Sequence, residues 1–492
     1  DAYPFEDTPV FQHAFNGVLT LADWLGSDRR FFEFTQDQQN TMTRAREAAA
    51  LAIKATGLDV ADFRSLLGPE PVTFTQLVSW APYDIQSSCM NLPNDPDGSL
   101  TILESDTGSG KTEAALIRFL RLYQAGLVDG LYFAVPTRSA ATQLYRRVHT
   151  IIDRVFQPAE NAPPVVQAVP GYIKVDDVEG KPLPRFKVLW PDQASDLLQF
   201  RGWAAEHSKR YLAGAVIVGT IDQVLLSVLQ VNHAHLRASA LLRHFLVIDE
   251  VHASDVYMTG LLELVLKNHL RAGGHALLMS ATLGTALRSR LKTGTSAPIP
   301  PLEESVHVPY PLITHRTASS LHTTEISATS SGKIKHIYTD MQAIAAEPDV
   351  IAQHAEKHAT QGARVLIIRN SVKDCIATQR ALEELLPLGS EFLFGVDKRP
   401  APHHSRFAPD DRQLLDDAIE QAFSKNAESQ PVVAVATQTV EQSLDIDADY
   451  LITDLCPMDV LLQRLGRLHR HERSRPSGYA DAQCMVITPS DR

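Results

Sequence analysis

The chain has 492 residues, with 46 Lys and Arg against 58 Asp and Glu, and a net charge of -12. At roughly 150 residues per domain, this length predicts about three folding units. A mix of 44% apolar and 21% charged residues excludes a disordered chain. The four cysteines stand far apart, which excludes a disulfide scaffold, argues against structural zinc and suits a reducing cytoplasm. No apolar run has the length of a membrane span, and the acidic balance argues weakly against bulk-charge coating of nucleic acid.

The N-terminal part is expected to be helical. The sequence begins at Asp1 rather than at Met, which we interpret as a fragment or a processed form. Residues 11–26 predict one amphipathic helix, and residues 36–66 predict one or two more.

From about Phe74, short apolar segments alternate with helical stretches, as in a parallel sheet that helices bury on both faces. Residues 285–335 are rich in Pro, Ser and Thr and predict a linker or boundary. The sequence therefore predicts an α/β fold of two tandem domains after a helical N-terminal piece. The predicted strands are residues 99–105, 131–136, 214–220, 244–250 and 275–282, then 364–371, 431–440 and 448–455.

A glycine-rich segment joins the first predicted strand to a predicted helix, which is the setting of a phosphate-binding loop. In such a loop, backbone N–H groups and the helix N-terminus attract phosphate. We expect Lys111 to reach the β- and γ-phosphates and Thr112 to ligate Mg²⁺. The alternative is a glycine-rich loop with a solvated lysine, and Ser105 stands where the strict pattern has Gly. The segment comprises Ser105, Asp106, Thr107, Gly108, Ser109, Gly110, Lys111 and Thr112.

The predicted strand 244–250 ends in two carboxylates, Asp249 and Glu250. Buried charge is costly without a partner, and a magnesium nucleotide would supply one. We expect Asp249 to hold Mg²⁺, mostly through water, and Glu250 to act as the general base that polarises the attacking water. The alternative is that the two carboxylates cap the next helix. The presence of a phosphate-binding loop earlier in the chain disfavours this alternative.

Five arginines crowd residues 463–475. The spacing of Arg464, Arg467 and Arg470 predicts that they lie along one side of a helix. Three like charges on one side predict an anion that neutralises them, and the planar arginine fork suits phosphate. We interpret this as a nucleotide in a cleft between the two α/β domains, with arginines supplied from the second domain. A solvated basic face is the alternative.

Together these segments resemble the motifs of superfamily 2 helicases over roughly residues 74–480. The resemblance to the Cas3 helicases of type I CRISPR systems is closer still, in residues 435–471, 218–227 and 404–412. The matching helicase motifs are Gln86 as the adenine-reading Q motif, 105–112 (motif I), 135–138 (Ia), 218–223 (Ib), 249–252 (II), 280–282 (III) and 463–470 (VI).

The resemblance implies an ATP-dependent motor that moves 3′→5′ along single-stranded DNA. Such a motor is recruited by a Cascade–crRNA effector, and an HD nuclease domain of the same protein degrades the strand. It further implies a prokaryotic cytoplasmic protein, which we expect to be a monomer. The implied roles are ATP and γ-phosphate contacts from Gln463, Arg467, Arg470, Asp445 and Arg464, DNA contacts from Pro136, Thr137, Arg138, Thr220 and Thr437, and coupling by Ser280 and Thr282.

The resemblance also implies the domain limits. We expect residues 1–35 to be the end of an HD nuclease-like domain, 36–73 a helical linker, 74–310 the first RecA-like domain and 311–492 the second. Asp23 and Ser27 match metal-site positions of an HD domain. Because the chain has no His-Asp doublet, the other ligands of its divalent transition metal are expected outside this chain, and Asp23 is better interpreted as a structural helix residue.

Three other functions remain open at this point. The chain could be another superfamily 2 helicase that acts on RNA or in DNA repair. It could be an interaction scaffold for Cascade with a vestigial ATP site, or a nuclease in its own right. Residues 435–471 disfavour the first, the intact ATP-site residues disfavour the second, and the missing His-Asp doublet disfavours the third.

Overall fold

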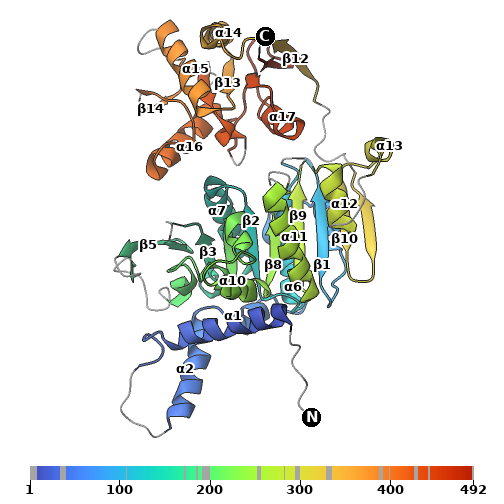
Figure 1. Ribbon diagram of the computed structural model, residues 1–492, viewed down its shortest axis with the longest axis vertical. Coiled ribbons are helices and arrows are strands. Elements are labelled where there is room, and N and C mark those ends of the chain that lie inside the picture. The colour runs from blue at the N-terminus through green and yellow to red at the C-terminus, as the bar shows by residue number, and fades with distance from the viewer. Residues whose placement is uncertain are drawn as a thin grey trace. The chain divides into compact units, whose positions relative to one another are not determined.

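Two α/β units make up the protein, Asp1–Ser331 and Gly332–Arg492, in the computed structural model (Figure 1). The structure describes residues 8–33, 40–106, 108–170, 173–183, 187–190, 200–251, 256–281, 283–293, 300–327, 335–386, 392–397, 399–425, 430–441 and 444–489.

A parallel sheet forms the centre of the first unit, and its five predicted strands are confirmed. In sheet order, β1, β9, β8, β2, β7 and β3 run parallel to one another (Figure 1). Three antiparallel strands extend this sheet beyond β3. The strands are β1 (Ser99–Glu104), β2 (Gly130–Val135), β3 (Val165–Ala168), β4 (Ile173–Val175), β5 (Val178–Leu183), β6 (Lys187–Leu189), β7 (Val216–Thr220), β8 (His244–Ile248) and β9 (His275–Ser280).

Helices cover both faces of this sheet, which explains why its central strands are buried along their whole length and mostly apolar. Along β1, Leu103 packs into one core with helices α6 and α7, whereas Leu100 and Ile102 pack into the other core with α9, α10 and α11. The helices of this unit near the sheet are α3 (Ala61–Ser65), α4 (Phe74–Leu77), α5 (Asp84–Met90), α6 (Lys111–Gln124), α7 (Arg138–Val155), α9 (Ile221–Leu225), α10 (Ala234–Leu241), α11 (Val256–Arg271) and α12 (Thr285–Thr293).

The expected boundary at residues 310/311 is displaced in the structure. After α13 (Leu302–Val306), strand β10 (Leu312–Arg316) pairs antiparallel with β1, and β11 (Leu321–Glu325) pairs with β10. These strands complete the first sheet, so the second unit begins at Gly332. The linker expected over residues 285–335 therefore contains two helices and an edge hairpin. The sequence did not reveal β11 because this strand is exposed along its whole length.

The second unit has a five-stranded parallel sheet, in the order β12-β18-β17-β13-β16. Its three predicted strands are confirmed as β13 (Arg364–Ile368), β16 (Val432–Ala436) and β17 (Tyr450–Asp454), and β12 (Ile337–Gln342) and β18 (Ala482–Ile487) are additional. The remaining elements are α14 (Pro348–Thr360), α15 (Val372–Leu385), α16 (Pro409–Phe423), α17 (Met458–Leu465), β14 (Gly395–Val396) and β15 (Arg399–Pro400).

The predicted N-terminal helices are confirmed as α1 (Pro9–Gly26) and α2 (Thr41–Ala55). Helix α1 packs closely on α10 at Gly17, where an added Cβ would overlap the carbonyl oxygen of His235 and the side chain of Ser239. The Ser239 hydroxyl also donates to the carbonyl of Ala14. This segment, which we expected to belong to a separate domain, thus packs on the first unit. Within the described ranges, no helix is long and apolar enough to cross a bilayer.

Three buried histidines predict a pH dependence for the stability of the first unit. His275 shares a hydrogen bond with Ser99 Oγ, and His315 shares one with Thr101 Oγ1, while His269 Nε2 meets the carbonyl of His275. The second ring nitrogen of each is buried and has no hydrogen-bond partner among the described residues. Burial lowers the pKa of each from 6.5 to about 4, and Arg118 contributes for His275 and His315.

Because the folded form binds these protons less readily than the unfolded chain, stability is retained above pH 6.5 and lost as the pH falls toward 4. We expect the free energy of unfolding to fall by up to about 2 kcal/mol per histidine between pH 7 and pH 5. Urea unfolding at the two pH values measures this. His275→Gln should reduce the fall in the free energy of unfolding between the two pH values, whereas the exposed His322→Gln should not. An equal fall in the wild type and in both variants would contradict the assignment.

Candidate functional site

The phosphate-binding loop lies at the carboxyl end of β1, as predicted, and leads directly into α6. Gly108 and Gly110 have φ values of 84° and 82°, a left-handed conformation that favours glycine. Lys111 is buried and donates from Nζ to the carbonyl oxygens of Ser105 and Asp106, at 2.7 and 2.9 Å. The lysine therefore hydrogen-bonds its own loop. Thr107, predicted for this loop, lies outside the described residues.

Gln86 contacts the loop rather than standing apart from it. Its Nε2 donates to the carbonyl of Gly110 at 3.0 Å, and its Oε1 accepts the backbone N–H of Tyr83 at 2.6 Å. The residue is only 1% exposed, and a Cβ at position 110 would overlap its amide. Gln86 thus holds the loop in shape, and its reading of adenine stays a prediction.

The acidic pair follows β8, two strands from β1 in the same sheet. Asp249 Oδ1 accepts the backbone N–H of Glu250 at 3.0 Å, and the N–H of Asp249 continues the sheet by donating to Ala134. Glu250 has a φ of 54°. A non-glycine residue in this region carries backbone strain, which is a common feature of catalytic positions.

The residues present fit Mg²⁺–ATP. Thr112 offers a half-buried hydroxyl beside the loop and Asp249 a carboxylate at the same sheet edge. Mg²⁺ prefers few protein ligands and completes its octahedron with phosphate oxygens and water. No group of three His, Cys, Asp or Glu side chains that could hold a metal by itself occurs in the described part of the chain.

The remaining predicted residues of the first unit gather at the same carboxyl edge, because each follows a parallel strand. Pro136, Thr137 and Arg138 follow β2, Thr220 ends β7 and Ser280 ends β9. Thr137 and Arg138 are exposed, and Thr137 also caps α7 by accepting the N–H of Ala140. Thr220 and Ser280 are buried. Thr282 lies outside the described residues.

The prediction that Arg464, Arg467 and Arg470 share one helix face is wrong. Helix α17 ends at Leu465 with Gly466 as its C-cap, so only Arg464 is helical. Arg464 is 2% exposed and donates to Glu441 at 2.7 Å, to Thr453 at 2.7 Å and to Asn370 at 2.9 Å. Arg464 is thus bonded within the second unit, and its contact with nucleotide stays a prediction.

The other motif VI residues are also bonded within the second unit. Arg467 donates to the carbonyl oxygens of Leu444 and Glu441 at 2.5 and 2.6 Å. Arg470 pairs with the partly exposed Asp445 at 2.9 Å. Gln463 is half-buried. Contact of any of these residues with the γ-phosphate stays a prediction.

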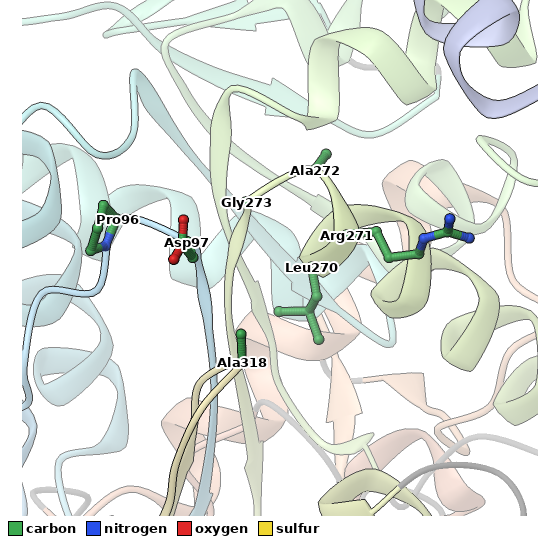
Figure 2. Close-up of a pocket in the computed structure, with 7 residues that line it drawn as sticks. All are labelled: Pro96, Asp97, Leu270, Arg271, Ala272, Gly273 and Ala318. Atoms are coloured by element: carbon green, nitrogen blue, oxygen red, sulfur yellow. The ribbon is translucent and has the colours of Figure 1, made fainter. Parts of the chain in front are cut away.

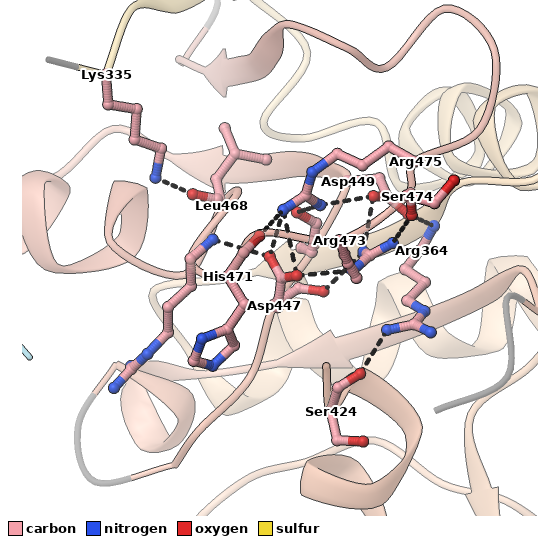
Figure 3. A network of polar contacts seen from close by, with 12 residues as sticks. Lys335, Arg364, Ser424, Asp447, Asp449, Leu468, His471, Arg473, Ser474 and Arg475 are labelled. Atoms are coloured by element: carbon pink, nitrogen blue, oxygen red, sulfur yellow. Dashed lines mark hydrogen bonds and ion pairs between the residues drawn. The ribbon is translucent and has the colours of Figure 1, made fainter. Parts of the chain in front are cut away.

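A buried carboxylate network neutralises the last arginines of the cluster (Figure 3). Arg473 pairs with Asp447 and Asp449, both at 2.7 Å, and Arg475 pairs with the same two carboxylates at 3.0 and 2.8 Å. Burial raises the pKa of Asp447, but Arg475 and Arg473 more than offset this and hold it below its ordinary value. The protein's own aspartates therefore neutralise Arg473 and Arg475, which were not among the three arginines for which an anion was predicted.

Two predicted residues stand away from these groups. Thr437, predicted to contact DNA, follows β16 and is buried, with its N–H bonded to His403. Asp23 is exposed on α1. Because the described residues contain no metal-binding group, Asp23 has no partner ligands there, and the predicted HD-site remnant stays a prediction.

A surface hollow of about 620 Å³ carries none of these residues (Figure 2). Pro96 and Asp97 precede β1, Ala272 and Gly273 precede β9, and Ala318 follows the antiparallel β10. The hollow thus lies at the amino edge of the first sheet. The phosphate-binding loop lies at the opposite edge.

Sequence reasoning missed three residues around the loop and two in the network. Glu104, Arg288 and Tyr310 contact the loop or its strand, and nothing in their sequence context indicates it. The sequence pattern did contain an indication of the pairing of Asp447 and Asp449. Alternating aspartates that enter β17, followed by alternating arginines at 473 and 475, predict paired charges.

Comparison with known proteins places these motifs in context. Residues 361–473 match a family model described as CRISPR-associated nuclease/helicase Cas3, C-terminal. The CRISPR-associated endonuclease/helicase Cas3 of Escherichia coli (strain K12) is 32% identical over 488 residues, which cover 96% of this chain and 52% of that protein. The chain spans about half the length of the curated relatives it matches.

Solved structures agree in fold. The crystal structure of T. fusca Cas3-ATP has a TM-score of 0.76 and 26% identity, over 98% of this chain and 55% of that chain. A chain of a CRISPR RNA-guided surveillance complex, pre-nicking, has a TM-score of 0.63 and 23% identity, over 98% of this chain and 52% of that chain. These likenesses confirm the predicted tandem RecA-like fold.

Proposed function

The chain belongs to the Cas3 helicase family, and from this membership we propose that it is the ATP-driven motor of a type I CRISPR interference protein, which moves along single-stranded DNA. The observation that supports the proposal most is the placement of a phosphate-binding loop and an Asp-Glu pair at one edge of one parallel sheet. Glycine N–H groups, Lys111 and Thr112 would bind and orient the phosphates. Thr112 and Asp249 would hold Mg²⁺, which would supply charge neutralisation. Glu250 accepts the proton of the attacking water.

The exposed residues at neighbouring strand ends supply the second half of the proposal. Thr137 and Arg138 offer a hydroxyl and a guanidinium to a DNA backbone at the same edge. Buried Thr220 and Thr437 offer mainly backbone groups in their present conformations.

We extend the proposal to the whole protein only through its family. Recruitment to Cascade-bound target DNA, 3′→5′ movement and strand degradation by an HD nuclease domain with a divalent transition metal are then expected of the longer protein. The family also supports a prokaryotic cytoplasmic location. Each of these points stays a prediction for this chain.

ATP hydrolysis stimulated by single-stranded DNA tests the proposal. Asp249→Asn should lower the stimulated rate at least about tenfold, because it removes a charged ligand of Mg²⁺ without changing the shape of the side chain. The exposed Asp349→Asn on α14 is the matched control and should keep the rate. Full activity of Asp249→Asn would refute the motor, and stimulation only by RNA would favour an RNA helicase instead.

A further inference from the structure

Contacts from the segment that leaves β9 hold the start of the phosphate-binding loop. Glu104, the last residue of β1, is 1% exposed and pairs with Arg288 of α12, whose Nε lies 2.9 and 3.0 Å from the two carboxylate oxygens. The N–H of Ser105 donates to the carbonyl of Ser280 at 3.1 Å. Two successive residues, Glu104 and Ser105, thus already contact the end of β9 or the helix that follows it.

Tyr310 adds a third link at the next residue of each segment. Its hydroxyl lies 2.9 Å from Asp106 Oδ1 in the loop and 3.0 Å from the carbonyl oxygen of Ala281 after Ser280. The tyrosine comes from neither segment, since it precedes β10, the strand that pairs with β1 on its other side. One side chain therefore connects three parts of the unit.

Both neighbours of this hydroxyl are acceptors, and a phenol has one proton to donate. Partial burial and the charge of Asp106 raise the pKa of Tyr310, which remains 44% exposed, so the proton is retained at working pH. The hydroxyl can donate fully to the carboxylate, fully to the carbonyl, or share its proton between them. Any shift of the loop relative to the β9 exit changes this division.

The identity of position 106 makes the link important for phosphate binding. A carboxylate in a phosphate-binding loop repels the anion that the loop is to hold. The Tyr310 hydrogen bond orients that carboxylate, and the carbonyl of the same residue accepts from Lys111 at 2.9 Å. Tyr310 therefore acts on the loop through Asp106 without itself being part of the phosphate site.

We propose that Tyr310 is a positioning residue that links the phosphate-binding loop to the β9 exit, residues 280–281, and that DNA stimulation of ATP hydrolysis depends on its hydroxyl. The inference rests on the proposed function, because it assigns Tyr310 a role in the coupling expected of motif III.

Tyr310→Phe removes only the hydroxyl. We expect the factor by which single-stranded DNA raises kcat to fall about tenfold, the size of effect that loss of one hydrogen bond to a charged group produces. The KM for ATP should change less than about twofold, because the phosphate ligands are untouched. Steady-state ATPase assays with and without DNA separate the two parameters. Tyr338→Phe, at an exposed tyrosine of β12, is the matched control and should behave as the wild type.

Two results would overturn the assignment. An unchanged stimulation factor would show that the hydroxyl couples nothing, and a raised KM with normal stimulation would limit Tyr310 to shaping the loop.

Amide hydrogen exchange without nucleotide tests the link even if the wild type shows no ATPase, which would refute the proposed function alone. Tyr310→Phe should speed exchange in peptides covering residues 99–106 and 275–281, whereas Tyr338→Phe should not. Equal exchange in the wild type and Tyr310→Phe would overturn the link.

Discussion

Replacing Glu250 with Gln is expected to lower kcat for ATP hydrolysis by about 10²–10⁴-fold, the usual contribution of a general base. Glutamine fills the same volume after β8 and tolerates the same backbone, but its amide cannot accept the proton of the attacking water. ATP binding should persist, because Lys111, Thr112 and the loop glycines are unchanged. Single-turnover hydrolysis together with nucleotide binding measured by calorimetry separates the two effects.

The exposed Glu303→Gln on α13 is the matched control for this variant. It removes the same charge from the same unit and should hydrolyse ATP at the wild-type rate. A rate for Glu250→Gln within a few-fold of the wild type would exclude Glu250 as the base. Loss of ATP binding would instead make it a structural residue of the site.

Asp447→Asn is expected to destabilise the second unit by about 3–5 kcal/mol, the cost of removing one partner from a buried ion pair. The Asp447 side chain is fully buried, and it accepts from Arg473 at 2.7 Å and from Arg475 at 3.0 Å (Figure 3). Asparagine would leave both guanidinium groups short of negative charge in a dry environment, with only Asp449 to share. Chemical unfolding followed by a signal from the second unit measures the loss.

Asp445→Asn provides the comparison, because it lies two residues earlier but is 59% exposed and pairs with Arg470 and His471 at the surface. Surface pairs contribute about 0–1 kcal/mol, so the variant should unfold almost as the wild type does. Equal losses in the two variants would contradict a special role for the buried network.

The strands that could be predicted are those whose burial is reflected in an apolar sequence. β1, β2, β7, β8 and β9 are buried along their whole length and mostly apolar, because helices cover both faces of the sheet. β11 and β12 were missed because exposed edge strands need no apolar side chains. The displaced boundary follows from the same cause, since the hairpin that completes the first sheet has the composition of a linker.

The site was predictable where one local segment carries the chemistry. The phosphate-binding loop and the acidic pair are contiguous, and their strand ends must meet at one edge of a parallel sheet. The helix predicted through Arg470 failed because regular spacing does not reveal that the chain turns at Gly466. Tyr310 and Arg288 could not be found, because their proximity to the loop comes from pairing between distant strands.

The hydrogen bonds of Lys111 to its own loop have a consequence for turnover. An anion that binds this lysine competes with two carbonyl oxygens of the same loop. Because these carbonyls are tethered beside the lysine, their effective concentration is high. A triphosphate that engages the whole loop wins this exchange through many contacts. On the proposed function, the free phosphate left after hydrolysis makes fewer contacts, so we expect the two carbonyls to draw the lysine back to the loop and to speed product release.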